Sequence, residues 1–165
     1  MYKLGFITNA SSTVSAIGGH YVKSEHSIDL LYPIISNDFF VGGQASSKIK
    51  IILQQLNLQP HVIKRIAICS YEAEMNVVMH AYHGHIKASI YADRTELIVS
   101  DVGPGIAAMD LVMQSDSSTA PDYIRTLGSR SGMGLSTIDK YANTFSVHSV
   151  VGHGTKVYIV VNHSY

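Results

Sequence analysis

The sequence predicts an α+β fold, a two-layer sandwich of a mixed, mostly antiparallel sheet with about three helices on one face. Apolar residues recur at helical spacing through residues 44–58 and again through residues 60–83. Two pairs of short apolar runs are joined by tight turns, at residues 93–94 and 152–154. Turns of this length join antiparallel strands, because parallel strands need a long crossover connection.

The first half of the chain holds one predicted strand and two predicted helices. Residues 27–36 form an apolar run with Pro33 inside it, and a proline within a strand indicates an edge position. The apolar residues of 44–58 recur at i, i+3, i+4 and i+7, which is typical of an amphipathic helix. The second helix, residues 60–83, begins with a proline, which suits a first helical turn, and we expect Gly84 to end it.

The second half combines strands with a long polar segment. Residues 106–131 begin with a short helix that we expect at 106–113 and continue as a polar stretch rich in Ser and Asp, with Gly128 near its end. A segment of this length in a compact domain is usually a functional loop or lid. We expect a third helix at residues 132–143 and strands at residues 85–92, 95–101, 144–151 and 155–160.

The composition indicates one globular unit. The chain has 165 residues, of which 46% are hydrophobic, enough for one sizeable core. Twelve basic residues balance twelve acidic ones, which argues against a main task of holding nucleic acid. Cys69 is the single cysteine; we expect it to be a small buried filler in a reducing compartment. The sequence contains no signal-peptide pattern and no apolar run long enough to span a membrane, so we expect a cytoplasmic protein.

A carboxylate and a carboxamide, Glu72 and Asn76, lie four residues apart on the second predicted helix, one turn above each other on one face. Glu72 can accept a proton from water or a hydroxyl, and the amide oxygen of Asn76 can bind a hard cation such as Mg²⁺. His80 continues this polar stripe, whereas we expect Glu74 to be solvated on another face. The alternative is that Glu72 and Asn76 are ordinary exposed polar residues of an amphipathic helix.

Asp101 ends an apolar run and precedes Gly103-Pro-Gly105, a tight turn at which something approaches the backbone closely. Its carboxylate can accept a hydrogen bond from an exocyclic amine, and the glycines leave room for a flat base. The alternative is an ordinary Asp-x-Gly turn. Residues 103–108 also fit a dinucleotide fingerprint, but we regard this as a false match, because no alternating βαβ unit is predicted.

Glycines open the third predicted helix. Gly132 and Gly134 expose backbone N–H groups there, and the helix dipole favours a phosphate at the same place. Arg130 could add a charged contact to the phosphates or to a partner. The alternative is a glycine-rich lid hinge that binds no ligand.

Together these elements resemble the GHKL ATPase family, and they resemble most closely its bacterial anti-sigma factor serine/threonine kinases. The resemblance covers roughly residues 40–161 and rests on four motifs in the order that the family has. Glu72-x-x-x-Asn76 looks like the N box, and Asp101-x-Gly103-x-Gly105, Gly132-Met133-Gly134-Leu135 and Gly154-Thr155 look like the three glycine boxes.

The resemblance implies a site for ATP and Mg²⁺ in residues 41–165, with residues 1–40 as an N-terminal extension that includes the edge strand. Glu72 would be the general base and Asn76 the Mg²⁺ ligand. Asp101 would bind the adenine amine, with Thr155 adding a hydroxyl nearby. The other candidate nucleotide-binding residues are His80, Gly103, Gly105, Ile106, Arg130, Gly132, Met133, Gly134 and Leu135.

Two hypotheses for the function follow. In the first, the protein binds Mg-ATP under a mobile lid and phosphorylates a serine or threonine on a regulatory partner, of the sigma-factor or anti-sigma-antagonist type, with Glu72 as the base. In the second, it is a non-catalytic switch in which ATP orders the lid and creates a surface for a partner protein. The oligomeric state stays open, a homodimer included.

Overall fold

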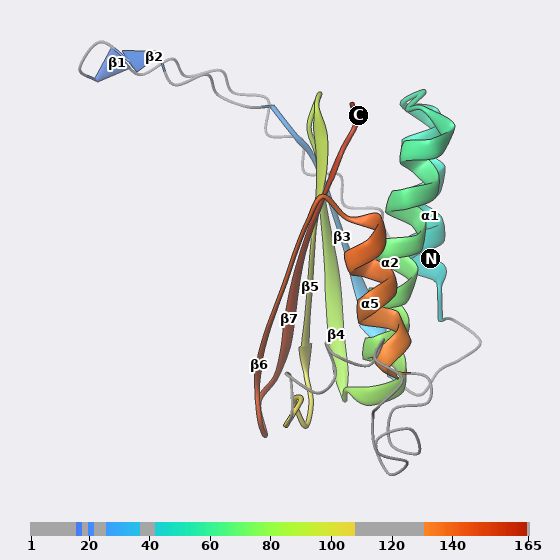
Figure 1. Ribbon diagram of the computed structural model, residues 1–165, viewed down its shortest axis with the longest axis vertical. Helices are drawn as coiled ribbons and strands as arrows, with labels where there is room; N and C mark the ends of the chain where they lie inside the picture. The colour runs from blue at the N-terminus through green and yellow to red at the C-terminus, as the bar shows by residue number, and fades with distance from the viewer. Residues whose placement is uncertain (1–15, 18–19, 22–25, 37–41, 108–130, 165) are drawn as a thin grey trace, which may run out of the picture.

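The computed structural model describes residues 16–17, 20–21, 26–36, 42–107 and 131–164. A five-stranded sheet forms one layer and the helices α1, α2 and α5 form the other, all on one face of the sheet (Figure 1). The predicted α+β sandwich is therefore confirmed. We expected a mixed sheet, but every strand pair in the described residues is antiparallel.

The sheet has the strand order β3-β4-β5-β7-β6. Its strands are β3 (Ile28–Ile35), β4 (His83–Ile90), β5 (Arg94–Val102), β6 (Thr144–Val150) and β7 (Gly154–Asn162). The helices are α1 (Gln44–Gln55), α2 (Pro60–His80) and α5 (Ser131–Tyr141). Two short strands, β1 (Ala16–Ile17) and β2 (His20–Tyr21), pair with each other.

The edge position of β3 is confirmed. Among the described strands β3 pairs only with β4, and Pro33 lies opposite His85 in that pairing. Leu30 and Ile34 point toward the helices and are buried, whereas Leu31 alternates to the other face and is 65% exposed. The strand thus contributes to the core through every second residue.

The end of α2 differs from the prediction. The helix ends at His80, because the backbone of Tyr82 instead donates a hydrogen bond to the Val102 carbonyl (2.8 Å) and β4 begins at the next residue. Gly84, expected to stop the helix, lies inside β4. A Cβ there would come 2.6 Å from the Ser100 carbonyl oxygen, so glycine is required by close strand packing.

The long polar segment is largely outside the described residues. Residues 106–107 are not helical, and the remainder of the short helix expected at 106–113 lies beyond them. Of the lid predicted over residues 106–131, residues 108–130 also fall outside the described part of the chain.

The core lies between the sheet and the helices. The predicted apolar stripe of α2 is confirmed, since Val62, Ile66, Cys69, Ala73 and Val77 are all buried. Cys69 is fully buried, and this burial raises the pKa of its thiol to about 12, so it packs as a neutral side chain. No helix in the described residues is long and apolar enough to cross a membrane.

Candidate functional site

The polar stripe of α2 borders α5. Glu72 and Asn76 are each partly buried, while Ala73 and Val77 on the adjacent face of the helix are buried in the core. The apolar stripe fixes the rotation of α2 against the sheet, and this rotation places the Glu72 carboxylate and the Asn76 amide on the side of α2 that faces α5.

Gly134 brings α5 directly onto these two side chains. A Cβ at Gly134 would lie 3.1 Å from Asn76 Oδ1 and 3.3 Å from Glu72 Oε2. Any larger residue would therefore press on both groups. The glycine motif that opens α5 and the Glu-Asn motif of α2, more than fifty residues apart in the sequence, meet at one place.

The Glu72 carboxylate is partly desolvated. Burial raises the pKa of Glu72 above its ordinary value, because removing water disfavours the charged form. Within the described residues no hydrogen bond or ion pair satisfies this carboxylate. A carboxylate with a raised pKa and free oxygen atoms suits a proton acceptor.

The expectation that Glu74 is solvated is wrong. Its side chain is 3% exposed, and its carboxylate accepts hydrogen bonds from the backbone N–H groups of Gly43 (3.1 Å), Ala45 (3.0 Å) and Ser46 (2.8 Å). These donors form the N-terminus of α1, where N–H groups have no partner within the helix. Glu74 therefore caps α1 from α2, and the negative charge is stabilised by the α1 dipole.

Asp101 lies near the end of β5 and contacts the start of β7. The backbone N–H of Thr155 donates a hydrogen bond to Asp101 Oδ1 (3.1 Å). Burial raises the pKa of Asp101, and the Thr155 hydrogen bond opposes that rise by favouring the charged form. The fold thus fixes Oδ1, and within the described residues Oδ2 has no hydrogen-bond partner.

The glycines around Asp101 let neighbouring backbones pack closely. A Cβ at Gly154 would lie 2.2 Å from the Asp101 carbonyl oxygen, and one at Gly105 would lie 2.4 Å from the Val150 carbonyl oxygen. Both have positive φ angles, 136° and 69°, which glycine adopts without strain. Gly103 is packed less tightly, since a Cβ there would lie 3.2 Å from Asp101 Oδ1. These glycines hold the turn after β5 against the β6–β7 turn.

Ser149 is a member of this cluster that the sequence reasoning missed. Its hydroxyl accepts a hydrogen bond from the Ile106 N–H (2.8 Å) and lies 2.9 Å from the Thr155 hydroxyl. Ser149 lies opposite Thr155 in the β6–β7 register. Only this register could have indicated it, since one serine in an alternating strand carries no signal of its own.

The C-terminal end of α2 links the two clusters. Asn76 lies five residues before Ala81, a helical distance of about 7.5 Å. A Cβ at Gly103 would lie 3.0 Å from Ala81 Cα, so the turn that follows Asp101 packs on the end of α2. His80 occupies this end and is exposed. Both clusters therefore lie along one stretch of the same helix.

The remaining predicted residues have varied positions. Gly132 and Met133 lie in the first turn of α5, Leu135 is buried in the core, and Ile106 packs partly buried against the core. Arg130 lies outside the described residues. The described residues contain no group of three or more His, Cys, Asp or Glu side chains that could hold a metal ion.

The two-layer fold and the two clusters along α2 define a class, the GHKL ATPase domain. The family described as the histidine kinase-like ATPase domain matches residues 43–161, well over half of the chain. The chain belongs to this family. The resemblance proposed from four short motifs is thus confirmed.

Several proteins of known name are similar to the chain. An anti-sigma F factor from Clostridium beijerinckii is 27% identical over 125 residues, which cover 71% of this chain and 84% of that protein. An anti-sigma F factor from Priestia megaterium is 30% identical over 95 residues, or 53% of this chain and 61% of that protein. The serine/threonine-protein kinase RsbT from Bacillus subtilis is 31% identical over 97 residues, or 56% of this chain and 67% of that protein.

Proposed function

We propose that this protein is an ATP-dependent protein kinase of the anti-sigma type, which phosphorylates a serine or threonine on a regulatory protein partner. The observation that carries the proposal is the contact of Gly134 with Glu72 and Asn76. It joins a partly desolvated carboxylate, a neutral amide oxygen and the beginning of a helix, three groups that can serve phosphate transfer. The names of two kinds of relatives, anti-sigma factor and serine/threonine kinase, support the same class.

In the proposed reaction, the partner's hydroxyl oxygen attacks the terminal phosphorus of ATP. The hydroxyl proton moves to the Glu72 carboxylate, the new O–P bond forms, and the bond from phosphorus to the leaving oxygen breaks to release ADP. The raised pKa of Glu72 suits this role, because a more basic carboxylate accepts the proton more readily. The backbone N–H groups in the first turn of α5 would stabilise the negative charge of the phosphates.

The residues fit a nucleotide and a magnesium ion. Oδ2 of Asp101 would accept a hydrogen bond from an exocyclic amine such as that of adenine. Asn76 Oδ1 is a neutral oxygen of the kind that Mg²⁺ accepts, and this ion usually takes its other ligands from water and phosphates. When bound, the ion would neutralise phosphate charge. Asn76 would orient it and Gly134 would leave the required space.

A second function is also supported by a specific observation. Relatives named anti-sigma F factor bear a name that describes opposition to a sigma factor rather than catalysis. In this alternative, ATP binding changes the affinity of the protein for its partner without phosphate transfer. The two functions share a nucleotide site and differ in what Glu72 does.

Nucleotide binding is tested first, by calorimetry with Mg-ATP on the wild-type chain and on Asp101→Asn. The variant keeps Oδ1 for Thr155 but loses an acceptor, so we expect affinity to fall about 10- to 100-fold. Asp93→Asn, in the exposed β4–β5 turn, is the matched control and is expected to bind normally. Absence of ATP binding by the wild type would contradict both functions.

Phosphate transfer is tested second, with radiolabelled ATP and proteins encoded beside this chain in the genome. Labelling of a serine or threonine on a partner supports the kinase. ATP-dependent association of that partner without labelling rejects the kinase in favour of the switch.

A further inference from the structure

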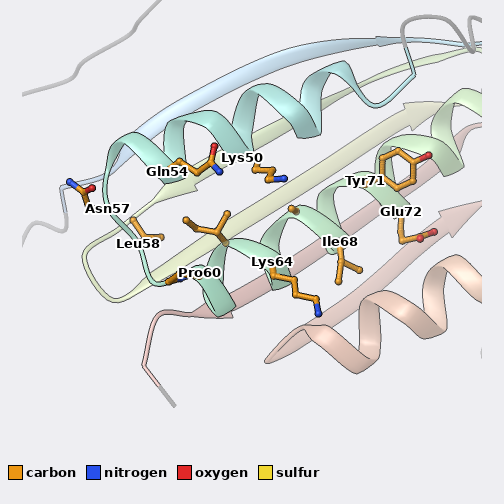
Figure 2. A pocket seen from close by; sticks show the side chains of 11 residues that line it. Lys50, Gln54, Asn57, Leu58, Pro60, Lys64, Ile68, Tyr71 and Glu72 are labelled. Carbon is orange, nitrogen blue, oxygen red and sulfur yellow. The ribbon is translucent and has the colours of Figure 1, made fainter.

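A groove of about 740 Å³ runs along the outward face of α2, beside α1 (Figure 2). It extends from Pro60 to Glu72, a helical length of about 18 Å. Its lining is mostly apolar and includes Ile63, Ile68 and Tyr71. This length suits an extended or helical peptide better than a small molecule.

Two lysines give the groove positive charge. Lys50 extends from α1 and Lys64 from α2, and both line the groove (Figure 2). Within the described residues neither ammonium group forms an ion pair or hydrogen bond. The other two cations on these helices have contacts elsewhere, because Arg65 donates to the Tyr141 carbonyl and Lys48 lies over the Tyr32 ring.

This charge is a local feature in a chain of zero net charge. Residues 44–71 contain four Lys or Arg residues and no Asp or Glu. The α2 N-terminus adds to the positive potential, since its first turn has no acidic residue and Gln59 provides no side-chain cap. A partner surface that carries carboxylates therefore complements this face of the helix layer.

The apolar lining distinguishes a peptide from a nucleic acid. A phosphate backbone would need further cations, and the groove offers Lys50 and Lys64 beside a largely aliphatic surface. An amphipathic helix places apolar side chains at i, i+3, i+4 and i+7 on such a surface and its acidic residues along the flanks. Each part of the groove then has a complementary group.

We propose that this groove docks an acidic amphipathic helix of the protein partner. The inference rests on the proposed function for the existence of that partner, and it adds where the partner binds and what chemistry its surface has. The groove ends at Glu72, so a helix seated in it leads the partner's chain toward the proposed base. Docking there needs no nucleotide, because none of the groove residues other than Glu72 belongs to the proposed ATP site.

The test uses the full chain and a fluorescein-labelled amphipathic peptide of about 14 residues, with Leu on one face and Glu on the flanks. A second peptide has Lys in place of each Glu. Fluorescence anisotropy gives the affinities, and amide chemical shifts in NMR spectra locate the bound peptide. We expect only the acidic peptide to bind, with shifts confined to α1 and the first half of α2.

The matched variants are Lys50→Glu/Lys64→Glu and, as control, Lys140→Glu/Lys156→Glu, which changes two exposed lysines outside the groove. We expect the groove variant to bind the acidic peptide at least about tenfold more weakly and the control to bind as the wild type does. Both should bind Mg-ATP as the wild type does. A melting curve for each variant confirms folding.

Several outcomes would overturn the inference: no binding of the acidic peptide, equal binding of both peptides, shifts elsewhere, or tight binding of a single-stranded oligonucleotide through the same lysines. A dimer in sedimentation experiments that Lys50→Glu/Lys64→Glu dissociates would identify a second copy as the occupant instead. Peptide binding without ATP binding would reject the proposed function while leaving the groove assignment intact. ATP binding without peptide binding would reject the groove assignment and leave the proposed function intact.

Discussion

Two carboxylates on opposite sides of α2 differ in burial and in hydrogen bonding. On the α1 side, Glu74 is buried and accepts three backbone hydrogen bonds. On the α5 side, Glu72 is partly buried and has no hydrogen bond within the described residues. The same residue type, two positions apart, thus stabilises the fold at one junction and remains chemically available at the other. The α1 junction is therefore structural, and we propose that the α5 junction is functional.

The largest expected effect is on catalysis, from Glu72→Gln. If Glu72 is the base, phosphate transfer falls about 10²- to 10⁴-fold, since the amide cannot accept the proton. The melting temperature should stay unchanged or rise, because the charged form of Glu72 is disfavoured by burial. Radiolabel transfer and thermal melting measure the two quantities. Normal phosphate transfer by this variant would show that Glu72 is not the base. The functional contrast between Glu72 and Glu74 would then fail.

The next effect is on stability, from Glu74→Ala. The substitution leaves three buried N–H groups at the start of α1 without an acceptor, so we expect a loss of about 3 kcal/mol. Urea unfolding of this variant beside Glu72→Ala gives a matched pair on one helix. Equal stability of the two variants would show that the two junctions do not differ.

A smaller effect is expected from Gly134→Ala. The new methyl group would lie 3.1 Å from Asn76 Oδ1 and 3.3 Å from Glu72 Oε2, so both side chains must shift by a few tenths of an ångström. Helix propensity favours Ala by about 1 kcal/mol, and stability should hardly fall. Phosphate transfer should still decrease, by about tenfold. Asp139→Ala, on the exposed face of α5, is the control, and equal activity of both variants would contradict a shared site.

The smallest expected effect is on the pH profile. Because burial raises the pKa of Glu72, the base becomes protonated at a higher pH than an ordinary Glu, and kcat should decline from that pH downward. The raised pKa of Glu72 also makes the stability of the fold depend on pH. The folded state binds the proton more tightly than the unfolded state, so this group destabilises the fold as pH rises through the raised pKa.

The measurement is kcat at saturating ATP, which separates Glu72 from Asp101. Burial also raises the pKa of Asp101, and its protonation would act on nucleotide affinity rather than on kcat. An acid limb that appears only in KM would assign the titration to Asp101 and remove the expected role of Glu72.

The sequence predicted the elements well because their signals are local. The amphipathic stripe of α2 and the turns at residues 93–94 and 152–154 each depend on neighbours a few residues apart. The α2 terminus was misplaced because a strand pairing decided it: the partner of His83 is Val102, nineteen residues away. Helix propensity depends on local sequence and gives no information about a competing strand pairing.

The site was only partly predictable, because several of its contacts join residues far apart in the sequence. Glu72 and Asn76 follow from helical spacing, but the contact with Gly134 joins residues about sixty positions apart and entered only through the family resemblance. Glu74 was assigned to solvent because its donors lie 28 to 31 residues earlier. Ser149 depended on the β6–β7 register. Long-range pairing therefore limited the prediction.

Strand β3 lies outside the region of family similarity but is part of the folded domain. The family match begins at residue 43, yet β3 precedes it, pairs with β4 over eight residues and buries Leu30 and Ile34 in the core. A gene fragment cut at the limit of similarity would lose this strand and leave β4 as a bare edge, open to pairing with other molecules. Anyone who shortens or recombines this chain should therefore join upstream of residue 28.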